Sequence, residues 1–278
     1  MGVYINMGRK ILDILQTEIE APLPYGVFHF SWCFVAIGLI ILLFTIRNKH
    51  NEKRLKWILG IYAIPTFILE ALKQLIWSVE YSTETAGFVW DFQWYAFPFQ
   101  LCTTPLYICL IALFLKKCKL RDYLLSFMGY ITILGSIATV VRPHDVFVSD
   151  LLIDIHTMYL HAGSLVVSVY LLLSREVEIN LKGFFRAVVT FIAFCAIANI
   201  MNIAVYNSGI LNGETFNMFY ISPYFESTLP VFDTIYNAVP YPVFLIIYVV
   251  ALSLGGFIIL GLAYMLESLI IKRKLKKA

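Results

Sequence analysis

The stretch GVFHFSWCFVAIGLIILLFTIR, from Gly26 to Arg47, is an apolar run long enough to cross a bilayer, and it ends at a cation. A helix of about 20 apolar residues spans the hydrocarbon core. Six later stretches have the same character: Leu55–Trp77, Phe97–Leu115, Tyr123–Val141, Leu151–Leu173, Phe184–Tyr206 and Pro242–Leu266. Only 14% of the residues are charged, whereas a soluble domain has about a quarter. The sequence predicts an all-α integral membrane protein, a seven-transmembrane helix bundle.

The loops between these spans differ sharply in positive charge. Lys and Arg gather in residues 47–56, 116–121, 175–186 and 272–277. The other loops contain Arg142 and no further Lys or Arg. Short loops rich in Lys and Arg stay in the cytoplasm. The pattern therefore predicts that the N-terminus is outside and the C-terminus is cytoplasmic.

These assignments divide the chain into three parts. In residues 1–25 apolar and charged side chains alternate at roughly helical spacing, which predicts an extracytoplasmic interfacial segment. No small-residue cleavage site follows an early apolar run, so this segment is unlike a signal peptide. Residues 26–268 form one membrane domain, and residues 269–278 form a basic cytoplasmic tail. The net charge of +3 reflects the loops and tail and gives no argument for nucleic acid.

The outer loop 207–241 contains the stretch NGETFNMFYISPYFESTLP, which is rich in aromatic residues. A loop of this length is usually functional or disordered, and this one is too apolar for disorder. We expect it to be a lid over the outer face, beside an interfacial belt of Trp90, Trp94 and Tyr95.

The sequence contains no CxxC or HxxxH pattern and no glycine-rich phosphate loop. Metal and nucleotide chemistry therefore have no sequence support, and we expect no cofactor. The five cysteines lie within spans or, for Cys118, in a basic loop, so none suggests an extracellular disulfide.

Polar side chains within the spans gather at the outer half of the predicted bundle. Such residues are costly in a bilayer and mark a site by default. Their convergence predicts an outward-facing polar cavity. The members are His29, Glu70, Lys73, Gln74, Gln100, Cys102, Thr103, Thr104, Arg142, His144, Asp154, His156, Thr157, His161, Asn199 and Asn202.

Helical phase separates the two histidines of the fifth span. His161 lies on a polar stripe at i, i+3/i+4, i+7 spacing, with Asp154, Ser164 and Ser168 among its members. His156 lies about 140° away at 100° per residue. His161 is therefore the better candidate for a role in the cavity.

Cys102 lies between Pro98 and Pro105, in a segment whose helical hydrogen bonds the prolines interrupt. A nucleophilic cysteine needs a base to take its proton, and His161 is at the same depth. Plainer interpretations remain open. Cys102 taken alone also suits space-filling in a core, the prolines suit a simple kink in the helix, and His161 suits a hydrogen bond to a neighbouring helix. Likewise, Glu70 with Lys73 suits a structural ion pair, and Asn199 and Asn202 suit interhelical contacts.

Three motifs resemble bacterial integral membrane proteins of the YwaF type and a related eukaryotic acyltransferase that remodels ether phospholipids. FPFQLC is similar to the Pro-Leu-His-Leu-Cys of that family, YLHAG to its Ser-His-Gly, and FNMFYISP to its Asn-Tyr outer loop that ends in proline. The resemblance implies a bacterial plasma-membrane protein in which Cys102 carries an acyl group and His161 assists. This chain departs from the pattern at Gln100, where the family often has histidine. Distant relatives with a threonine nucleophile make Thr103 a second candidate.

The sequence thus leads to a hypothesis of a lipid acyltransferase or transacylase with phospholipid and lysophospholipid substrates. Candidate donors to the developing oxyanion are Gln100, Thr103, Asn202 and Asn217, and Arg142 is the candidate phosphate contact. An alternative is a binding or transport protein in which Glu70, Lys73, Asp154 and His161 are ion or proton sites. A third is a membrane anchor for a neighbouring protein, which predicts tolerance of substitution at Cys102.

Overall fold

The computed structural model describes residues 2–47, 51–144 and 146–275. Six helical stretches in these residues are long and apolar enough to cross a membrane, so the chain is a multi-pass membrane protein. They are α2 (Val27–Thr45), α3 (Glu52–Ser78), the continuous run Lys119–Val141, α7 (Leu151–Leu173), α8 (Leu181–Asn207) and α10 (Tyr241–Leu275). The run Lys119–Val141 consists of α5 (Lys119–Phe127), the π-helix η2 (Met128–Thr132) and α6 (Ile133–Val141). Lys49, Lys276 and Lys277 of the predicted basic segments lie outside the described residues.

The third predicted span, Phe97–Leu115, is not a continuous helix. Its helix α4 covers only Thr104–Phe114, or about 16 Å at 1.5 Å per residue, half the thickness of a bilayer core. The short 3-10 helix η1 (Trp94–Ala96) and the irregular residues 97–103 precede it. Pro98 and Pro105 explain the break, because neither can donate a backbone hydrogen bond and Pro105 sits in the first turn of α4.

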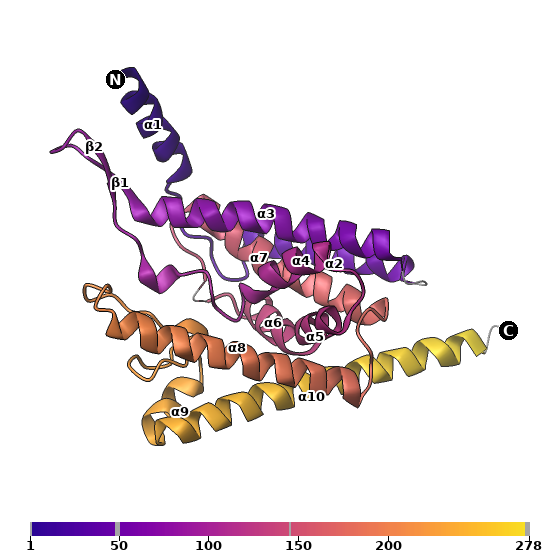
Figure 1. Ribbon diagram of the computed structural model, residues 1–278. Coiled ribbons are helices and arrows are strands. Elements are labelled where there is room, and N and C mark those ends of the chain that lie inside the picture. Colours follow the sequence, from indigo (N-terminus) through magenta and orange to yellow (C-terminus); the bar gives the residue numbers. More distant parts are fainter. Residues whose placement is uncertain (1, 48–50, 145, 276–278) are drawn as a thin grey trace.

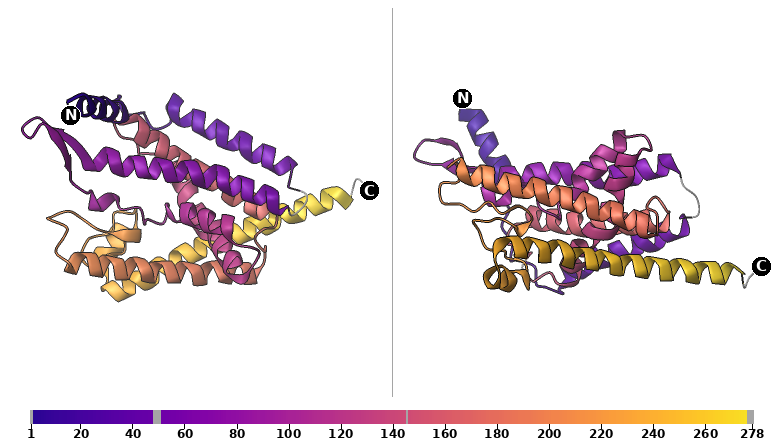
Figure 2. Two further views of the ribbon diagram at one scale, coloured as in Figure 1. Left: turned by 45° about the horizontal axis from the view of Figure 1, so that its top comes forward. Right: turned by 60° about the horizontal axis from the view of Figure 1, so that its bottom comes forward.

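The helices lie side by side with the two termini at opposite ends of the bundle (Figures 1 and 2). Within it α7 packs against α2, α3 and α6, while α4 packs against α3 and α5 packs against α8. The N-terminal end carries α1 (Gly2–Leu15), the strands β1 (Val79–Ser82) and β2 (Gly87–Trp90), and α9 (Phe232–Ala238) (Figure 1). The links from α4 to α5 and from α7 to α8 lie toward the other end.

Side-chain caps define the starts of three of the long helices. Asn51, Asp150 and Asn180 each accept a hydrogen bond from a backbone N–H three residues later, at 2.9–3.1 Å. Such a cap satisfies one of the first backbone donors of a helix, which have no partner within it. The caps explain why α3, α7 and α8 begin where they do.

The β-hairpin was not predicted from the sequence. Its strands pair antiparallel, with Val79 opposite Trp90 and Ser82 opposite Gly87. The hairpin contacts α1, where the Arg9 guanidinium lies 5.0 Å from the centre of the Tyr81 ring. Gln16 binds the junction of α3 and β1, because its side chain donates to the carbonyls of Ile76 and Val79 at 2.7 and 2.9 Å. The N-terminal segment is therefore fastened to the end of the bundle that carries the hairpin.

The π-helix lies where α10 comes closest to the centre of the fold. A Cβ added at Gly256 of α10 would lie 2.9 Å from the Tyr130 carbonyl oxygen of η2. Tyr130 and Ile131 are fully buried. Only glycine allows the two backbones to approach this closely.

We predict that Gly256→Ala destabilises the protein, whereas Gly261→Ala does not. Both changes gain similar helix propensity, but no atom lies within 4 Å of a Cβ added at Gly261. Forcing a methyl group against the Tyr130 carbonyl costs about 1–3 kcal/mol. Thermal unfolding in one detergent gives the difference between the variants, and equal melting temperatures would contradict this packing.

Candidate functional site

The turn that carries Cys102 is held by its own backbone and by one side chain within it. The N–H groups of Thr103 and Thr104 both donate to the Gln100 carbonyl, at 3.0 and 3.2 Å. The Thr103 hydroxyl accepts from the Gln100 N–H at 2.8 Å and donates to the Gln100 carbonyl at 2.9 Å. Thr103 is buried and both of its hydrogen-bonding roles are used, so its hydroxyl serves the turn.

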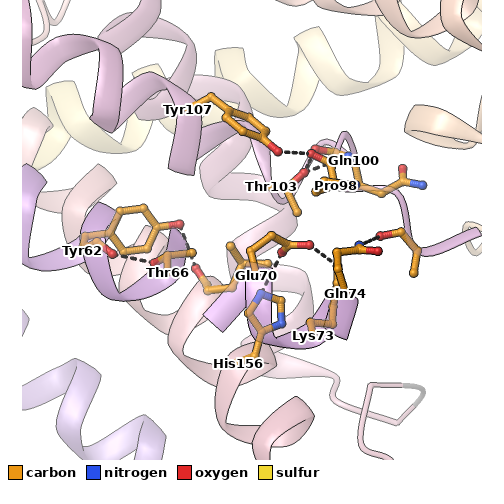
Figure 3. Close-up of polar contacts among 12 residues, drawn as sticks. Tyr62, Thr66, Glu70, Lys73, Gln74, Pro98, Gln100, Thr103, Tyr107 and His156 are labelled. Atoms are coloured by element: carbon orange, nitrogen blue, oxygen red, sulfur yellow. Dashed lines mark hydrogen bonds and ion pairs between the residues drawn. The ribbon is translucent and has the colours of Figure 1, made fainter. Parts of the chain in front are cut away.

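Side chains of α3 and α4 donate hydrogen bonds to three further carbonyls, those of Ala96, Pro98 and Leu101 (Figure 3). Gln74 of α3 donates to the Ala96 carbonyl at 2.7 Å, and the Tyr107 hydroxyl of α4 donates to the Pro98 carbonyl at 2.5 Å. The Thr104 hydroxyl donates to the Leu101 carbonyl at 2.7 Å. These bonds fix the position of the Cys102 backbone at the head of a short helix.

Two predicted site residues, Gln100 and Asn202, hold the loop 207–241 to the bundle, and a third, Asn217, lies within that loop. Gln100 donates to the Asn217 carbonyl at 3.0 Å and accepts from the Phe219 N–H at 2.8 Å. The Asn202 side chain of α8 donates to the Met218 carbonyl at 3.1 Å and accepts from the Met218 N–H at 2.7 Å. The Asn217 side chain bonds to Ser222 and Glu226 within the loop.

The loop segment held in this way is packed and locally strained. Phe216, Met218, Phe219 and Ile221 are almost completely buried. Phe219 and Tyr220 have φ angles of 59° and 58°, in the left-handed region that non-glycine residues rarely adopt. Backbone in this region persists only where surrounding contacts hold it in place. Hydrogen bonds from the side-chain amides of Gln100 and Asn202 hold it here.

A buried charged cluster lies on the face of α3 between α4 and α7. Glu70 forms an ion pair with Lys73 through one carboxylate oxygen. The other oxygen is 2.9 Å from Nε2 of His156. In Figure 3 the Glu70 carboxylate lies between the His156 ring and the turn that carries Gln100 and Thr103. A charge taken out of water in this way needs a partner, and here one carboxylate has two.

Cys102 is a free, half-buried cysteine in the turn that Gln100 and Thr103 hold. Electrostatic interactions reach it from Lys73 and Glu70 of α3. The hydroxyl groups of Tyr62, Tyr220 and Tyr248 are also within electrostatic range of the thiol.

His161 belongs to the neighbouring helix α7 and has an unused ring nitrogen. Its Nδ1 atom is buried and has no hydrogen-bond partner among the described residues. Tyr62 of α3 packs against this level of α7, because its hydroxyl donates to the Leu160 carbonyl at 3.3 Å and its ring fills the space beside Gly163. No hydrogen bond joins the Cys102 sulfur to His161 in the described structure. A substrate, water or side-chain movement has to connect the two.

A second cysteine and histidine lie closer together but lack the chemistry of a dyad. The Sγ atom of Cys33 is 3.4 Å from Nε2 of His29. The same nitrogen lies 2.8 Å from the Val140 carbonyl oxygen, which only accepts hydrogen bonds. Nε2 therefore carries a hydrogen and cannot take a proton from the Cys33 thiol. This pair joins α2 to the end of α6.

The other predicted site residues are placed as follows in the bundle. Arg142 is exposed at the end of α6, and its backbone N–H completes that helix. Asp154 accepts a hydrogen bond from the Val148 N–H at 2.9 Å through one oxygen. Asn199 accepts from the Tyr241 hydroxyl at 2.7 Å. The described residues contain no group of three or more His, Cys, Asp or Glu side chains arranged to hold a metal ion.

Comparison with known families identifies the chain. The TMEM164 family model matches residues 24–260. The chain belongs to the TMEM164 family. No curated protein and no solved structure matches it. The match to the TMEM164 family begins just before α2 and ends within α10, so it includes Cys102, His161 and the outer loop.

We predict that Asn202→Ala loosens the outer loop. The change removes two bonds to Met218 and leaves a buried N–H and a buried carbonyl without partners, at about 1–3 kcal/mol each. Hydrogen exchange in residues 214–222 should accelerate. Asn207→Ala is the matched control, because Asn207 is an exposed asparagine of the same helix. Unchanged exchange in Asn202→Ala would show that the loop is held by other contacts.

Proposed function

We propose that this member of the TMEM164 family is a lipid acyltransferase or transacylase that uses Cys102 as its nucleophile. The observation that carries the proposal is the free Cys102 thiol on an irregular turn, held in a polar junction beside charged residues. A buried cysteine that only fills space needs neither the broken helix nor the charges. The buried and doubly bonded Thr103 hydroxyl supports sulfur over oxygen as the nucleophile.

The proposed reaction has two balanced steps. The Cys102 thiol gives its proton to His161, and the thiolate attacks the ester carbonyl of a phospholipid. The ester C–O bond breaks, the imidazolium returns the proton to the leaving alkoxide, and a lysophospholipid departs from the acyl thioester. In the second step the hydroxyl group of another lysophospholipid gives its proton to His161 and attacks the thioester. The proton then returns to the Cys102 sulfur.

The predicted oxyanion donors can act only if the outer loop moves. In the described structure the amide groups of Gln100, Asn202 and Asn217 bond to the backbone of that loop. An outward movement of the loop would free Gln100 and Asn202 to stabilise the developing oxyanion. Arg142, exposed at the outer end of α6, is available to a lipid phosphate. The loop would thus act as a lid.

The proposed topology has seven crossings, with the N-terminus outside and the C-terminus in the cytoplasm of a bacterial cell. Termini at opposite ends of the bundle support an odd number of crossings (Figure 1). Six long helices and the segment Phe97–Leu115 together give seven. Irregular backbone at membrane depth is tolerated where protein shields it, and residues 97–102 are half-buried while Thr103 is buried. Residues 1–25 would then lie on the outer surface, and residues 269–278 would form the cytoplasmic tail.

A second candidate function is solute or lipid binding and transport without chemistry. The buried cluster of Glu70, Lys73 and His156 favours it, because charged groups in a membrane often mark an ion or proton path. The two functions differ at Cys102. Transport tolerates Cys102→Ala and depends on Glu70, whereas acyl transfer requires the thiol.

We predict that Cys102→Ala abolishes acyl transfer and that His161→Ala lowers its rate by about 10²–10⁴. The double variant should be no slower than Cys102→Ala, because residues that act as a unit are not additive. The assay follows a labelled acyl chain from phospholipid to lysophospholipid in nanodiscs. Cys109→Ala is the control, since Cys109 is a buried thiol of α4 that lies 3.6 Å from the Met128 sulfur. Full activity in Cys102→Ala would contradict the cysteine mechanism and make Thr103 the next candidate.

We predict that a reporter fused after Ala278 is active only if it functions in the cytoplasm. The physical reason is the gathering of Lys and Arg in the segments at the C-terminal end of the bundle. A matched pair of fusions, alkaline phosphatase and green fluorescent protein, gives opposite signals on the two sides. Phosphatase activity from the C-terminal fusion would contradict the topology.

A further inference from the structure

Helix α3 contains a proline in its interior, and the carbonyl group that this proline leaves free bonds to another helix. Pro65 has no N–H, so the Ile61 carbonyl one turn earlier loses its partner within α3. In a membrane helix a Ser or Thr side chain or a neighbouring helix can satisfy such a carbonyl. The Thr66 hydroxyl does not, because it donates to the Tyr62 carbonyl at 2.6 Å. The Tyr159 hydroxyl of α7 donates to the Ile61 carbonyl at 2.6 Å instead.

A reciprocal contact runs from α3 to α7. The Tyr62 hydroxyl donates to the Leu160 carbonyl at 3.3 Å, and the rings of Tyr62 and Tyr159 stack with 6.4 Å between their centres and 7° between their planes. A Cβ added at Gly163 would lie 2.8 Å from the Tyr62 ring, so only glycine leaves room for it. Trp32 of α2 packs edge-on against Tyr159 at 6.3 Å. We call these contacts of Tyr62 and Tyr159 the tyrosine clasp.

The tyrosine clasp fastens α3 to the level of α7 that carries His161. Tyr159 and Leu160 directly precede His161 in the chain, so their bonds to α3 fix the position of that turn of α7. Beyond the proline, Nε2 of His156 lies 2.9 Å from the Glu70 carboxylate. Helix α7 therefore contacts α3 on both sides of the interruption.

The part of α3 beyond the proline holds the segment that carries Cys102. Gln74 lies about 14 Å beyond Pro65 at 1.5 Å per residue. Its side chain donates to the Ala96 carbonyl at 2.7 Å, and α4, which begins directly after the turn of Cys102, also packs against α3. A helix changes direction most readily at a proline. The direction that α3 takes at Pro65 therefore decides where this segment lies relative to α7.

We propose that the tyrosine clasp sets the position of the Cys102 turn relative to His161. Tyr62 and Tyr159 are then positioning residues, and Pro65 is the point at which the direction of α3 is decided. The inference rests on the proposed function, in which Cys102 and His161 act together. No hydrogen bond joins these two side chains in the described structure, so their separation depends on the helices that carry them. Reacting groups have to come within about 3–3.5 Å, and a misplacement of about 1 Å can slow a reaction strongly.

The first test is a double-mutant cycle in thermal unfolding, with the full chain in nanodiscs. Tyr159→Phe keeps the ring and leaves the Ile61 carbonyl without its partner, whereas Pro65→Ala returns an N–H to that carbonyl. Tyr159→Phe should lower the melting temperature of the native protein by about 2–4 °C and change it little in the Pro65→Ala background. Tyr264→Phe, at an exposed tyrosine of α10, is the control and should have no effect. Equal losses in the two backgrounds would overturn the inference.

The second test measures the direction of α3. Genetically encoded spin-labelled residues at Ala71 of α3 and Phe34 of α2 are both exposed and leave the cysteines untouched, and α2 packs against α7. Ala71 lies about 9 Å beyond Pro65, so a change of about 20° in direction moves it by about 3 Å. Double electron–electron resonance should show a shift of this size in Pro65→Ala and a shifted or broadened distance in Tyr159→Phe. Unchanged distances in both variants would overturn the inference.

Acyl transfer supplies a readout that a merely structural role would not change. In Tyr159→Phe and in Pro65→Ala, kcat should fall about tenfold or more while KM stays nearly constant, because lipid binding does not require the thiol and the imidazole to be aligned. Tyr264→Phe should keep both values. Where Pro65→Ala does not fold, Tyr159→Phe gives the same readouts, and an unchanged distance or an unchanged kcat in that variant would overturn the positioning role.

The outcomes separate this inference from the proposed function. A coupled unfolding cycle with a shifted distance would support the tyrosine clasp even if the native protein transfers no acyl chain, a result that would contradict the proposed function alone. A shifted distance with full kcat would overturn the positioning role and leave the cysteine mechanism intact.

Discussion

The structure depends on one constraint, which is that a backbone group in hydrocarbon must have a hydrogen-bond partner. Residues 96–103 are irregular or lie in turns too short to form a helical ladder, so several of their carbonyls need partners from elsewhere. Gln74, Tyr107 and Thr104 provide them from α3 and α4. The break is therefore stable, and it places the half-buried Cys102 at the head of a short helix.

The same constraint couples the thiol to the outer loop. Gln100 belongs to the turn of Cys102, yet its side chain binds the backbone on both sides of Met218. Glu214 binds the other end of this region by accepting from the Trp94 N–H at 2.7 Å. A movement of the loop that admits a lipid therefore has to rearrange the contacts of the turn. In the proposed function, lid opening and placement of the nucleophile are one event.

The six long helices and their order follow from apolar length and charge, which are local properties of the sequence. The break at residues 97–103 was indicated by Pro98 and Pro105, but the length of α4 was not, because the number of helical residues lost depends on partners such as Gln74. The hairpin was missed although Val79, Tyr81, Phe88 and Trp90 alternate around a turn. The predicted depth of each residue in the bundle put Cys102 at the level of the charged residues. No local pattern connects Glu70 with His156, or Gln100 with residues 217–219, so these contacts could not be predicted from the sequence.

The central claim is that Cys102 carries an acyl group, and intact-mass spectrometry tests it most directly. The protein is purified with native lipid, or incubated with a phospholipid of one known acyl chain, and its mass is measured before and after hydroxylamine. The account predicts an increase equal to one acyl chain, which hydroxylamine removes and which is missing in Cys102→Ala. An adduct that resists hydroxylamine, an adduct that persists in Cys102→Ala, or no adduct under conditions of active transfer would contradict the cysteine mechanism.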